Sequence, residues 1–236
     1  MTASLAAGDW LDGLDADSVL RGQGADSARV RARSPRLTAI AERAAREGVR
    51  LLEPRVTYRI LGVRSREHDR VLLDGDKALT GPLVSGQLRE ASKVAVLVAT
   101  IGHGLEARVS RMFGRDLPYA LALDGLGCAA VEGLARSARR HLTERARNKG
   151  WRATAPLSPG MEGWPLGPGQ REVFRLLDPR VCGVQLTDEG FLVPRKTLTF
   201  ALGLGACVAQ GDEAQACDSC AARPRCRYRS PHGTLR

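Results

Sequence analysis

The chain has 236 residues, which is enough for one sizeable domain or for one domain with an appendage. Its longest apolar runs are too short to span a bilayer, and acids occupy the N-terminal stretch where a secretory signal needs positive charge, so we expect a soluble, cytoplasmic protein with no membrane partner. The net charge is +10, but the arginines are scattered and aromatic residues make up only 4% of the chain, which disfavours nucleic-acid binding. The pattern favours a solvated basic surface, which could face an acidic protein partner.

The first third of the chain combines helical and strand patterns. Ser34 followed by Pro35 predicts a helix start, because serine caps free N–H groups and proline fits the first helical position. Apolar residues at helical spacing then run to Gly48, where the helix should end. The expected elements are a short helix at 15–20, a loop up to residue 34, a helix at 35–48, strands at 56–60 and 70–73, and a helix from residue 82.

A buried strand at 94–101 leads into Gly102-x-Gly104-x-x-Ala107 and a helix to about residue 113. This spacing is similar to a dinucleotide-binding fingerprint. That fingerprint requires an acid at the tip of a second parallel strand, whereas Asp124 stands in a stretch with helical spacing. Dinucleotide binding is therefore disfavoured, and we interpret His103 as a turn residue rather than a catalyst.

The longest expected element is a helix at about 119–145. Asp124 and Glu132 lie a little over two turns apart, so their carboxylates should share a face. They form either a solvated acidic stripe or a ligand contact, and spacing alone does not choose between these. Cys128 and Cys182 have no neighbouring cysteine, which predicts small buried apolar side chains.

Residues 151–169 are rich in proline and glycine, which predicts an ordered loop of fixed shape. Ordered loops of this length are usually functional. After the loop we expect a helix at about 168–177, a hairpin made of 184–186 and 191–193, and a strand at 196–202.

Four cysteines follow this last strand, and two of them form a Cys-x-x-Cys. They are Cys207, Cys217, Cys220 and Cys226. Four thiols this close together, without a secretory signal, favour a metal over disulfides. The sequence therefore predicts a four-sulfur metal site in the C-terminal tail.

The identity of the metal stays open at this point. Zinc sites made of four cysteines usually contain two Cys-x-x-Cys knuckles, and only one is present here. The uneven spacing is similar to the ligand pattern at the C-terminal end of some nuclease iron–sulfur domains, and neighbouring arginines would offset the negative charge of such a cluster. We favour an iron–sulfur cluster of the 4Fe-4S type, with zinc as the alternative and disulfides or free thiols as the remaining possibilities.

Several stretches, in order over about residues 15–203, resemble the activation domain of cobalamin-dependent methionine synthase and its stand-alone relatives. No single motif is decisive, but their order is fairly specific. The residues that carry the resemblance are Thr100-Ile101-Gly102, Asp124, Glu132, Ser158-Pro159-Gly160, Trp164-Pro165, Gly183-Val184-Gln185-Leu186-Thr187 and Pro194.

The resemblance implies an α+β, helmet-like fold around a twisted antiparallel sheet at 1–203. The cysteine-rich metal-binding tail, which the cysteine spacing predicts, then occupies 204–236. The resemblance also implies a domain that binds S-adenosylmethionine, sits over a corrinoid domain and remethylates cobalamin oxidised to the cob(II) state, once an electron is delivered. Through the resemblance, Glu132 is expected to contact the ligand amine. Asp124, Ser158 and Gly160 are further candidates for cofactor binding.

The chain departs from the family pattern in the loop that begins Arg-x-x-Pro-Gly-Tyr. Pro159 and Gly160 are kept, but Pro156 stands at the arginine position and Met161 at the tyrosine position. An arginine would hold the ligand's carboxylate with two hydrogen bonds, and losing a charge-assisted bond costs about 1.5–3 kcal/mol. S-adenosylmethionine binding is therefore in question, unless a neighbour such as Arg152 replaces the missing charge.

These observations combine into one expected function. The sequence has no Asp-x-His-x-x-Gly, the motif by which partner domains in this family ligate cobalt. We expect an accessory protein that docks on another protein's corrinoid and supports reductive reactivation of cob(II)alamin, with the iron–sulfur cluster as the electron-transfer centre and a donor protein upstream. The alternative is a non-catalytic module that caps a corrinoid protein and is stabilised by structural zinc. No catalytic residue is assigned.

Overall fold

The structure is a computed structural model that describes residues 10–211. Within this range the largest sheet has six strands in the order β3-β2-β1-β4-β8-β5, and all neighbouring pairs are antiparallel. The strands are β1 (Arg55–Glu67), β2 (Arg70–Leu73), β3 (Lys77–Thr80), β4 (Lys93–Thr100), β5 (Arg152–Ala153) and β8 (Thr197–Gly205). A separate hairpin consists of β6 (Gln185–Leu186) and β7 (Leu192–Val193). The predicted antiparallel α+β fold is confirmed.

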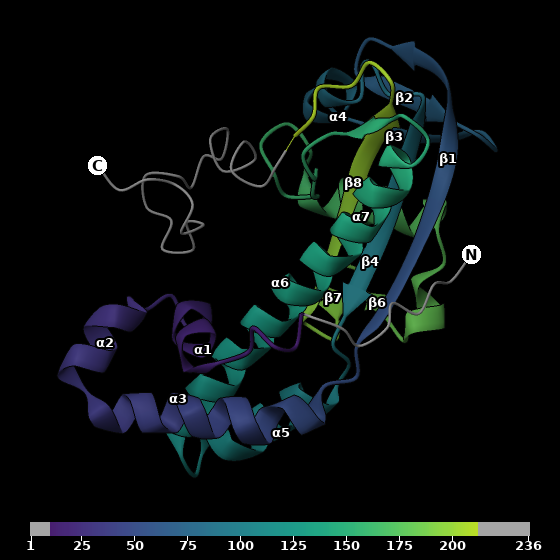
Figure 1. The fold of residues 1–236 in the computed structure, drawn as a ribbon. Helices are drawn as coiled ribbons and strands as arrows, with labels where there is room; N and C mark the ends of the chain where they lie inside the picture. The colour runs from purple at the N-terminus through teal and green to yellow at the C-terminus, as the bar shows by residue number, and fades with distance from the viewer. Residues whose placement is uncertain (1–9, 212–236) are drawn as a thin grey trace.

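The sheet curls because β1 changes partner along its length. Its first half pairs with β4 and its second half with β2, and the register shifts between Val63 and Ser65. Such an irregularity bends a strand and increases its twist. Figure 1 shows β1 as a long curved strand that carries β2 and β3 away from the plane of β4 and β8.

Helices cover both faces of the sheet (Figure 1). The long helix α6 (Leu117–Arg147) lies across one face, and α1 (Ala16–Gly22), α3 (Pro35–Gly48) and α5 (Gly104–Phe113) pack around its N-terminal half. Helix α2 (Ser27–Arg33) packs on α1 and α3 at the outer edge of this group. The short η1 (Val49–Leu51) leads from α3 towards β1. The other face carries α4 (Pro82–Gln87), α7 (Leu166–Leu176) and η2 (Pro179–Cys182).

Strand β4 separates two hydrophobic cores. Ala95, Leu97 and Ala99 belong to the core beneath α6, whereas the alternating valines at 94, 96 and 98 belong to the core beneath α7. All six side chains are fully buried. A strand buried on both faces has a continuous apolar sequence, which is why the pattern at 94–101 predicted it.

Helix α6 is long and apolar enough to cross a membrane by length and composition alone. In the fold, however, 56% of its apolar window is buried against the sheet and the neighbouring helices. This burial is typical of the core helix of a soluble protein.

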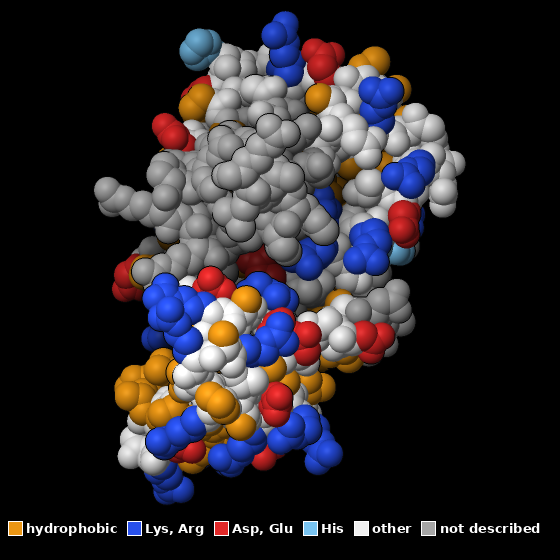
Figure 2. Space-filling view, turned by 60° about the vertical axis from the view of Figure 1, so that its left-hand side comes forward, with side chains coloured by type: hydrophobic (Ala, Val, Ile, Leu, Met, Phe, Trp, Pro, Cys, Tyr) orange, Lys and Arg blue, Asp and Glu red, His pale blue; other side chains and the backbone are white. Residues whose placement is uncertain are grey.

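Figure 2 shows Lys and Arg side chains dispersed among acidic and apolar ones over the visible face, as the scattered arginines of the sequence indicate.

Two glycines allow α1 to cross α6 at close range. A Cβ added at Gly125 would lie 2.6 Å from the carbonyl oxygen of Val19, and one at Gly22 would lie 2.1 Å from the carbonyl oxygen of Gly125. Both distances are shorter than real Cβ contacts, and the obstructing atoms belong to the backbone. The crossing therefore depends on the absence of side chains.

We expect Gly125→Ala to destabilise the protein by about 1–3 kcal/mol, because α1 must move away from α6. Gly133→Ala is the matched control on the same helix, since the added methyl would meet its nearest atom, the Trp10 carbonyl oxygen, at an ordinary 3.5 Å. The control should be neutral or stabilising by up to about 1 kcal/mol through helix propensity. Urea unfolding of both variants measures the difference, and equal stability of the two would contradict the tight crossing.

The structure differs from the sequence prediction in the loop before residue 34 and at the end of β8. The loop expected after the first helix is wrong in part, because α2 forms with Asp26 accepting a 3.1 Å hydrogen bond from the Arg29 N–H. This helix has no buried residue, so it lacks the apolar periodicity that would have predicted it. As expected, Asp124 lies inside α6 rather than at the tip of a second parallel strand, and both neighbours of β4 are antiparallel. Strand β8 also continues to Gly205, past the predicted boundary after residue 203.

Candidate functional site: a groove along the edge of β8

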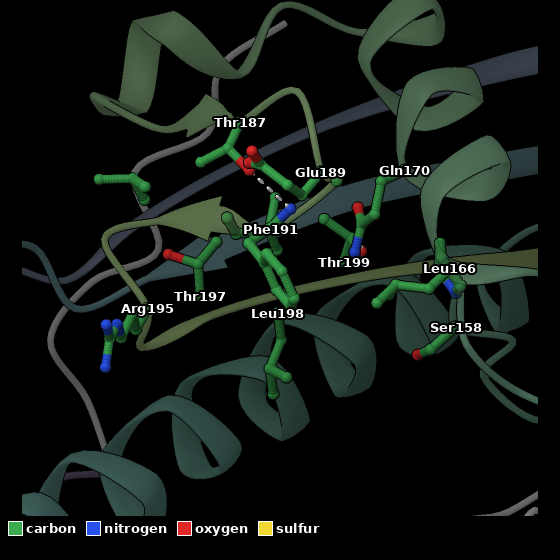
Figure 3. A pocket seen from close by; sticks show the side chains of 14 residues that line it. Ser158, Leu166, Gln170, Thr187, Glu189, Phe191, Arg195, Thr197, Leu198 and Thr199 are labelled. Carbon is green, nitrogen blue, oxygen red and sulfur yellow. Dashed lines mark hydrogen bonds between the residues drawn. The ribbon is translucent and has the colours of Figure 1, made fainter.

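A groove with a volume of about 730 Å³ opens beside the first half of β8 (Figure 3). Three structures enclose it: the loop before α7, the first turns of α7, and the β6–β7 hairpin with the segment after it. The lining residues are Ser158, Pro159, Leu166, Gln170, Thr187, Glu189, Gly190, Phe191, Leu192, Val193, Arg195, Thr197, Leu198 and Thr199.

The groove exists because β5 is too short to cover β8. Arg152 and Ala153 pair only with the end of β8, and a single bridge between Leu157 and Ala201 follows. Within residues 10–211, no strand pairs with Thr197–Thr199 on this side. The first part of β8 is therefore an open sheet edge.

The open edge presents backbone hydrogen-bonding groups to the groove. Ala201 exchanges two hydrogen bonds with Leu157, of 2.8 and 2.9 Å, on the side away from β4. Because alternate residues of a strand direct their N–H and C=O to the same side, Thr199 presents both groups in this direction. In the described part of the chain neither group has a backbone partner. A ligand in the groove could bond to this donor and acceptor together.

The floor of the groove is a buried polar contact between the sheet and α7. The Thr199 hydroxyl donates a 3.0 Å hydrogen bond to Oε1 of Gln170, and both side chains are buried. Figure 3 shows Gln170 reaching from α7 towards Thr199 on β8. Because this hydrogen bond is buried, it joins α7 to β8 directly beside the open backbone edge.

The proline- and glycine-rich loop has a defined shape, as predicted. Its anchor is Trp164, which is fully buried and donates a 3.1 Å hydrogen bond from Nε1 to Glu172. The Gly160 N–H donates to the Trp164 carbonyl at 2.8 Å, and Gly160 has a φ of +97°, which glycine adopts without strain. The turn that results places Ser158 and Pro159 at the groove.

The rim of the groove is apolar and exposed. The β6–β7 hairpin is closed by Thr187, whose N–H donates to the Phe191 carbonyl at 2.9 Å and whose hydroxyl accepts from the Phe191 N–H at 3.2 Å. Phe191 is 61% exposed, and Leu166 and Val193 are exposed as well. Such a rim is typical of a surface that another molecule covers.

Two charged side chains line the groove, one of each sign. Hydrogen bonds from its own backbone N–H and from the Thr187 hydroxyl hold the pKa of Glu189 below its ordinary value, so this carboxylate is charged at neutral pH. Arg195 carries the positive charge, with its backbone N–H 3.2 Å and its Nε 3.6 Å from the Glu106 carboxylate. The groove can therefore meet both charges of a zwitterion.

The sequence-predicted site residues separate into two groups. Ser158 lines the groove, and Gly160 lies in the same turn. Asp124 and Glu132 lie on α6 and are not lining residues. Asp124 instead forms a 2.8 Å ion pair with Lys196.

Lys196 also corrects the prediction for Cys128. Its Nζ donates a hydrogen bond to the Cys128 Sγ at 3.1 Å, and Cys128 is only half-buried, so it is not a simple apolar side chain of the core. Burial lowers the Lys196 pKa, but the hydrogen bonds with Asp124 and Cys128 outweigh burial and leave the pKa raised. Cys182 is buried in the core beneath α7, as predicted.

The predicted metal site lies largely outside the described residues. Cys207 is exposed and lies two residues after the end of β8, whereas Cys217, Cys220 and Cys226 lie outside residues 10–211. Within the described range, no group of three or more His, Cys, Asp or Glu side chains could hold a metal ion. The four-cysteine site therefore stays a prediction.

Sequence reasoning did not find Arg195, Gln170 or Thr199. The candidate substitute for the missing arginine, Arg152, pairs with Gly205 at the far end of β8, six residues or about 20 Å from Thr199. Arg195 is the arginine that lines the groove. No motif connects these residues, because strand pairing and the short β5 bring them together.

The structure thus defines a class of domain: an antiparallel α+β fold with one long helix across a curled sheet and a ligand-sized groove at the sheet edge. No family model and no curated protein matches the sequence. Among solved structures, the chain is similar to the "MetH Reactivation Domain bound to AdoHcy", with a TM-score of 0.60 and 14% identity over 86% of this chain and 77% of that chain. This chain therefore has the fold of the MetH reactivation domain, as its sequence motifs indicated.

Proposed function

We propose that this protein docks on a corrinoid-binding partner and supports the reductive reactivation of its cob(II)alamin. The observation that carries the proposal is the groove at the open edge of β8, in a chain with the fold of a domain that was crystallised with AdoHcy. The groove's volume of about 730 Å³ is within the usual range for small-molecule sites.

The chemistry of the groove fits S-adenosylmethionine or S-adenosylhomocysteine. An adenine ring presents an amino donor next to a ring-nitrogen acceptor, which complements the C=O and N–H of Thr199. Arg195 would bind the ligand's carboxylate, and Glu189 would bind its ammonium group. Arg195 thereby replaces the arginine that is absent at Pro156.

Asp124 and Glu132 remain candidates for contact with a part of the ligand that passes over the β8 edge. Leu198 supports this proposal, because it lines the groove and also packs against the core beneath α6. Figure 3 shows its side chain pointing away from Gln170 and towards that helix. The groove thus extends around the edge of the sheet towards the helix that carries both acids.

The corrinoid partner would cover the apolar rim formed by Leu166, Phe191 and Val193. Exposed apolar side chains around a polar groove are typical of a docking surface, because burying them contributes to affinity. A partner seated there would bring its cobalt close to the ligand in the groove.

We further propose that Cys207, Cys217, Cys220 and Cys226 hold the iron–sulfur cluster that transfers the electron to cob(II)alamin, supplied by a donor protein. Such clusters exchange single electrons at low potential. The proposal is supported by the cysteine spacing and by the position of Cys207 two residues after β8, the strand that borders the groove. Structural zinc in a non-catalytic capping module is the alternative, favoured by Pro156 and Met161 at the family's arginine and tyrosine positions.

Anaerobic purification with metal and sulfide analysis tests the cluster. We expect iron with acid-labile sulfide and a visible absorption band that dithionite bleaches. Cys220→Ser should lose the band, whereas Cys128→Ser, outside the motif, should keep it. A colourless protein with stoichiometric zinc and no sulfide would establish the alternative.

The docking role is tested with corrinoid proteins captured by the purified protein. After capture, the bound corrinoid is converted to its cob(II) form, and S-adenosylmethionine and a reductant are added. We expect the cob(II) absorption to be replaced by that of methylcobalamin only when this protein is present. Unchanged cob(II)alamin in a captured complex would contradict reactivation and leave a capping role.

A further inference from the structure

A second cavity, of about 400 Å³, lies at the C-terminal end of α7. It is enclosed by α7, the segment that leads into η2, and side chains from β1 and β3. The lining residues are Arg59, Lys77, Phe174, Arg175, Leu177, Asp178, Pro179 and Arg180. It shares no lining residue with the β8 groove, which contacts the opposite end of α7.

The charge around this cavity is strongly positive. Four cationic side chains surround it with a single acid, Asp178. That acid is already neutralised, because Arg180 donates hydrogen bonds of 2.8 and 3.0 Å to its two carboxylate oxygens. The other three cations, Arg59, Lys77 and Arg175, form no ion pair with a carboxylate in the described part of the chain. Within residues 10–211, three positive charges therefore face the cavity without a paired carboxylate.

The end of α7 does not cancel this positive charge. A helix C-terminus carries partial negative charge on its free carbonyls, which would repel an anion. Here the Arg59 Nη1 donates a 3.2 Å hydrogen bond to the Leu176 carbonyl, and Arg175 stands in the last turn. Arg59 thus neutralises the helix end and still has guanidinium N–H groups for a ligand.

The remaining wall of the cavity is apolar. Phe174 is half-buried and Leu177 and Pro179 are buried, so they form a fixed surface beside the cations. A flat ring can pack against such a wall. The cavity therefore combines a multiply cationic side with a surface for an aromatic or heterocyclic group.

We propose that this cavity binds a phosphorylated small molecule that carries a flat ring, of the nucleotide class. A phosphate ester brings up to two negative charges and several acceptor oxygens, which suit three uncompensated cations better than a single carboxylate does. The volume of about 400 Å³ admits a mononucleotide. The ring would lie against Phe174, and the phosphate between Lys77 and Arg175.

Calorimetric titration with AMP, adenosine and inorganic pyrophosphate tests the site. We expect AMP to bind saturably, adenosine to bind far more weakly, and added salt to weaken AMP binding. Lys77→Ala and Arg175→Ala should each lower AMP affinity about tenfold, by loss of one charge-assisted bond. Arg171→Ala removes the same charge from the same helix outside the cavity and should leave affinity unchanged.

Several outcomes would overturn the proposal. The first is no saturable binding of AMP or pyrophosphate at millimolar concentration, and the second is an equal loss of affinity in Arg171→Ala. If the protein binds poly-glutamate but not AMP, the ligand of this cavity is an acidic protein surface rather than a nucleotide. The circular dichroism of each variant checks its folding. S-adenosylhomocysteine binding should be unaffected by all three substitutions, so failure here leaves the proposal for the β8 groove untouched.

Discussion

Replacing Trp164 with alanine is expected to lower the free energy of unfolding by about 3–5 kcal/mol, the usual cost of removing a large buried aromatic side chain. Trp164 is fully buried in the core beneath α7. Its Nε1 also bonds Glu172, which accepts a second hydrogen bond from the Thr80 N–H at 3.2 Å. The substitution therefore leaves a cavity and removes one partner of a carboxylate that links α7 to β3.

The same substitution should abolish ligand binding in the β8 groove. Trp164 holds the turn at Gly160, and this turn places Ser158 and Pro159 in the wall of the groove. Urea unfolding and calorimetric titration with S-adenosylhomocysteine measure the two effects. The control is Trp151→Ala, because Trp151 is only half-buried and does not line the groove. A Trp164→Ala protein that binds the ligand as tightly as the parent would show that the loop does not shape the site.

The elements that the sequence predicted correctly are those with local causes. Helix α3 begins where Ser34 accepts a hydrogen bond from the Leu37 N–H, as its capping sequence indicated. Strand β4 is buried on both faces, so its apolar run was sufficient evidence. Helix α2 was missed because it has no fully buried residue and only Val30 packs against the core. Strand β3 was missed because four residues between turns give little periodicity.

The candidate site was only partly predictable, because long-range pairing creates it. The loop at Ser158 was found through its composition. The open edge at Thr199 exists only because β5 stops after two residues, and the sequence has no signal for this. Similarly, the contact between Lys196 and Cys128 joins residues 68 positions apart, so Cys128 appeared to be an isolated apolar side chain.

Arg195→Ala is expected to weaken S-adenosylhomocysteine binding tenfold or more, because one charge-assisted pair with the ligand's carboxylate contributes about 1.5–3 kcal/mol. Arg195 is 86% exposed and its Nε lies 3.6 Å from Glu106. An exposed pair of this kind contributes little to stability, so the side chain can turn to the ligand at low cost and its removal should not unfold the protein. Arg152→Ala is the matched control, with the same loss of charge at the far end of β8.

A second substitution makes this prediction stricter. Pro156 stands where the resemblance to the methionine synthase activation domain leads us to expect an arginine, two residues before Ser158 in the groove wall. If the groove needs one guanidinium for the carboxylate, Pro156→Arg in the Arg195→Ala background should restore most of the lost affinity. Calorimetric titration of the parent, the two single variants and the double variant provides a complete cycle. An Arg195→Ala protein that retains full affinity would place the carboxylate elsewhere. An equal effect of Pro156→Arg in the parent and in the Arg195→Ala background would mean that the two positions act independently.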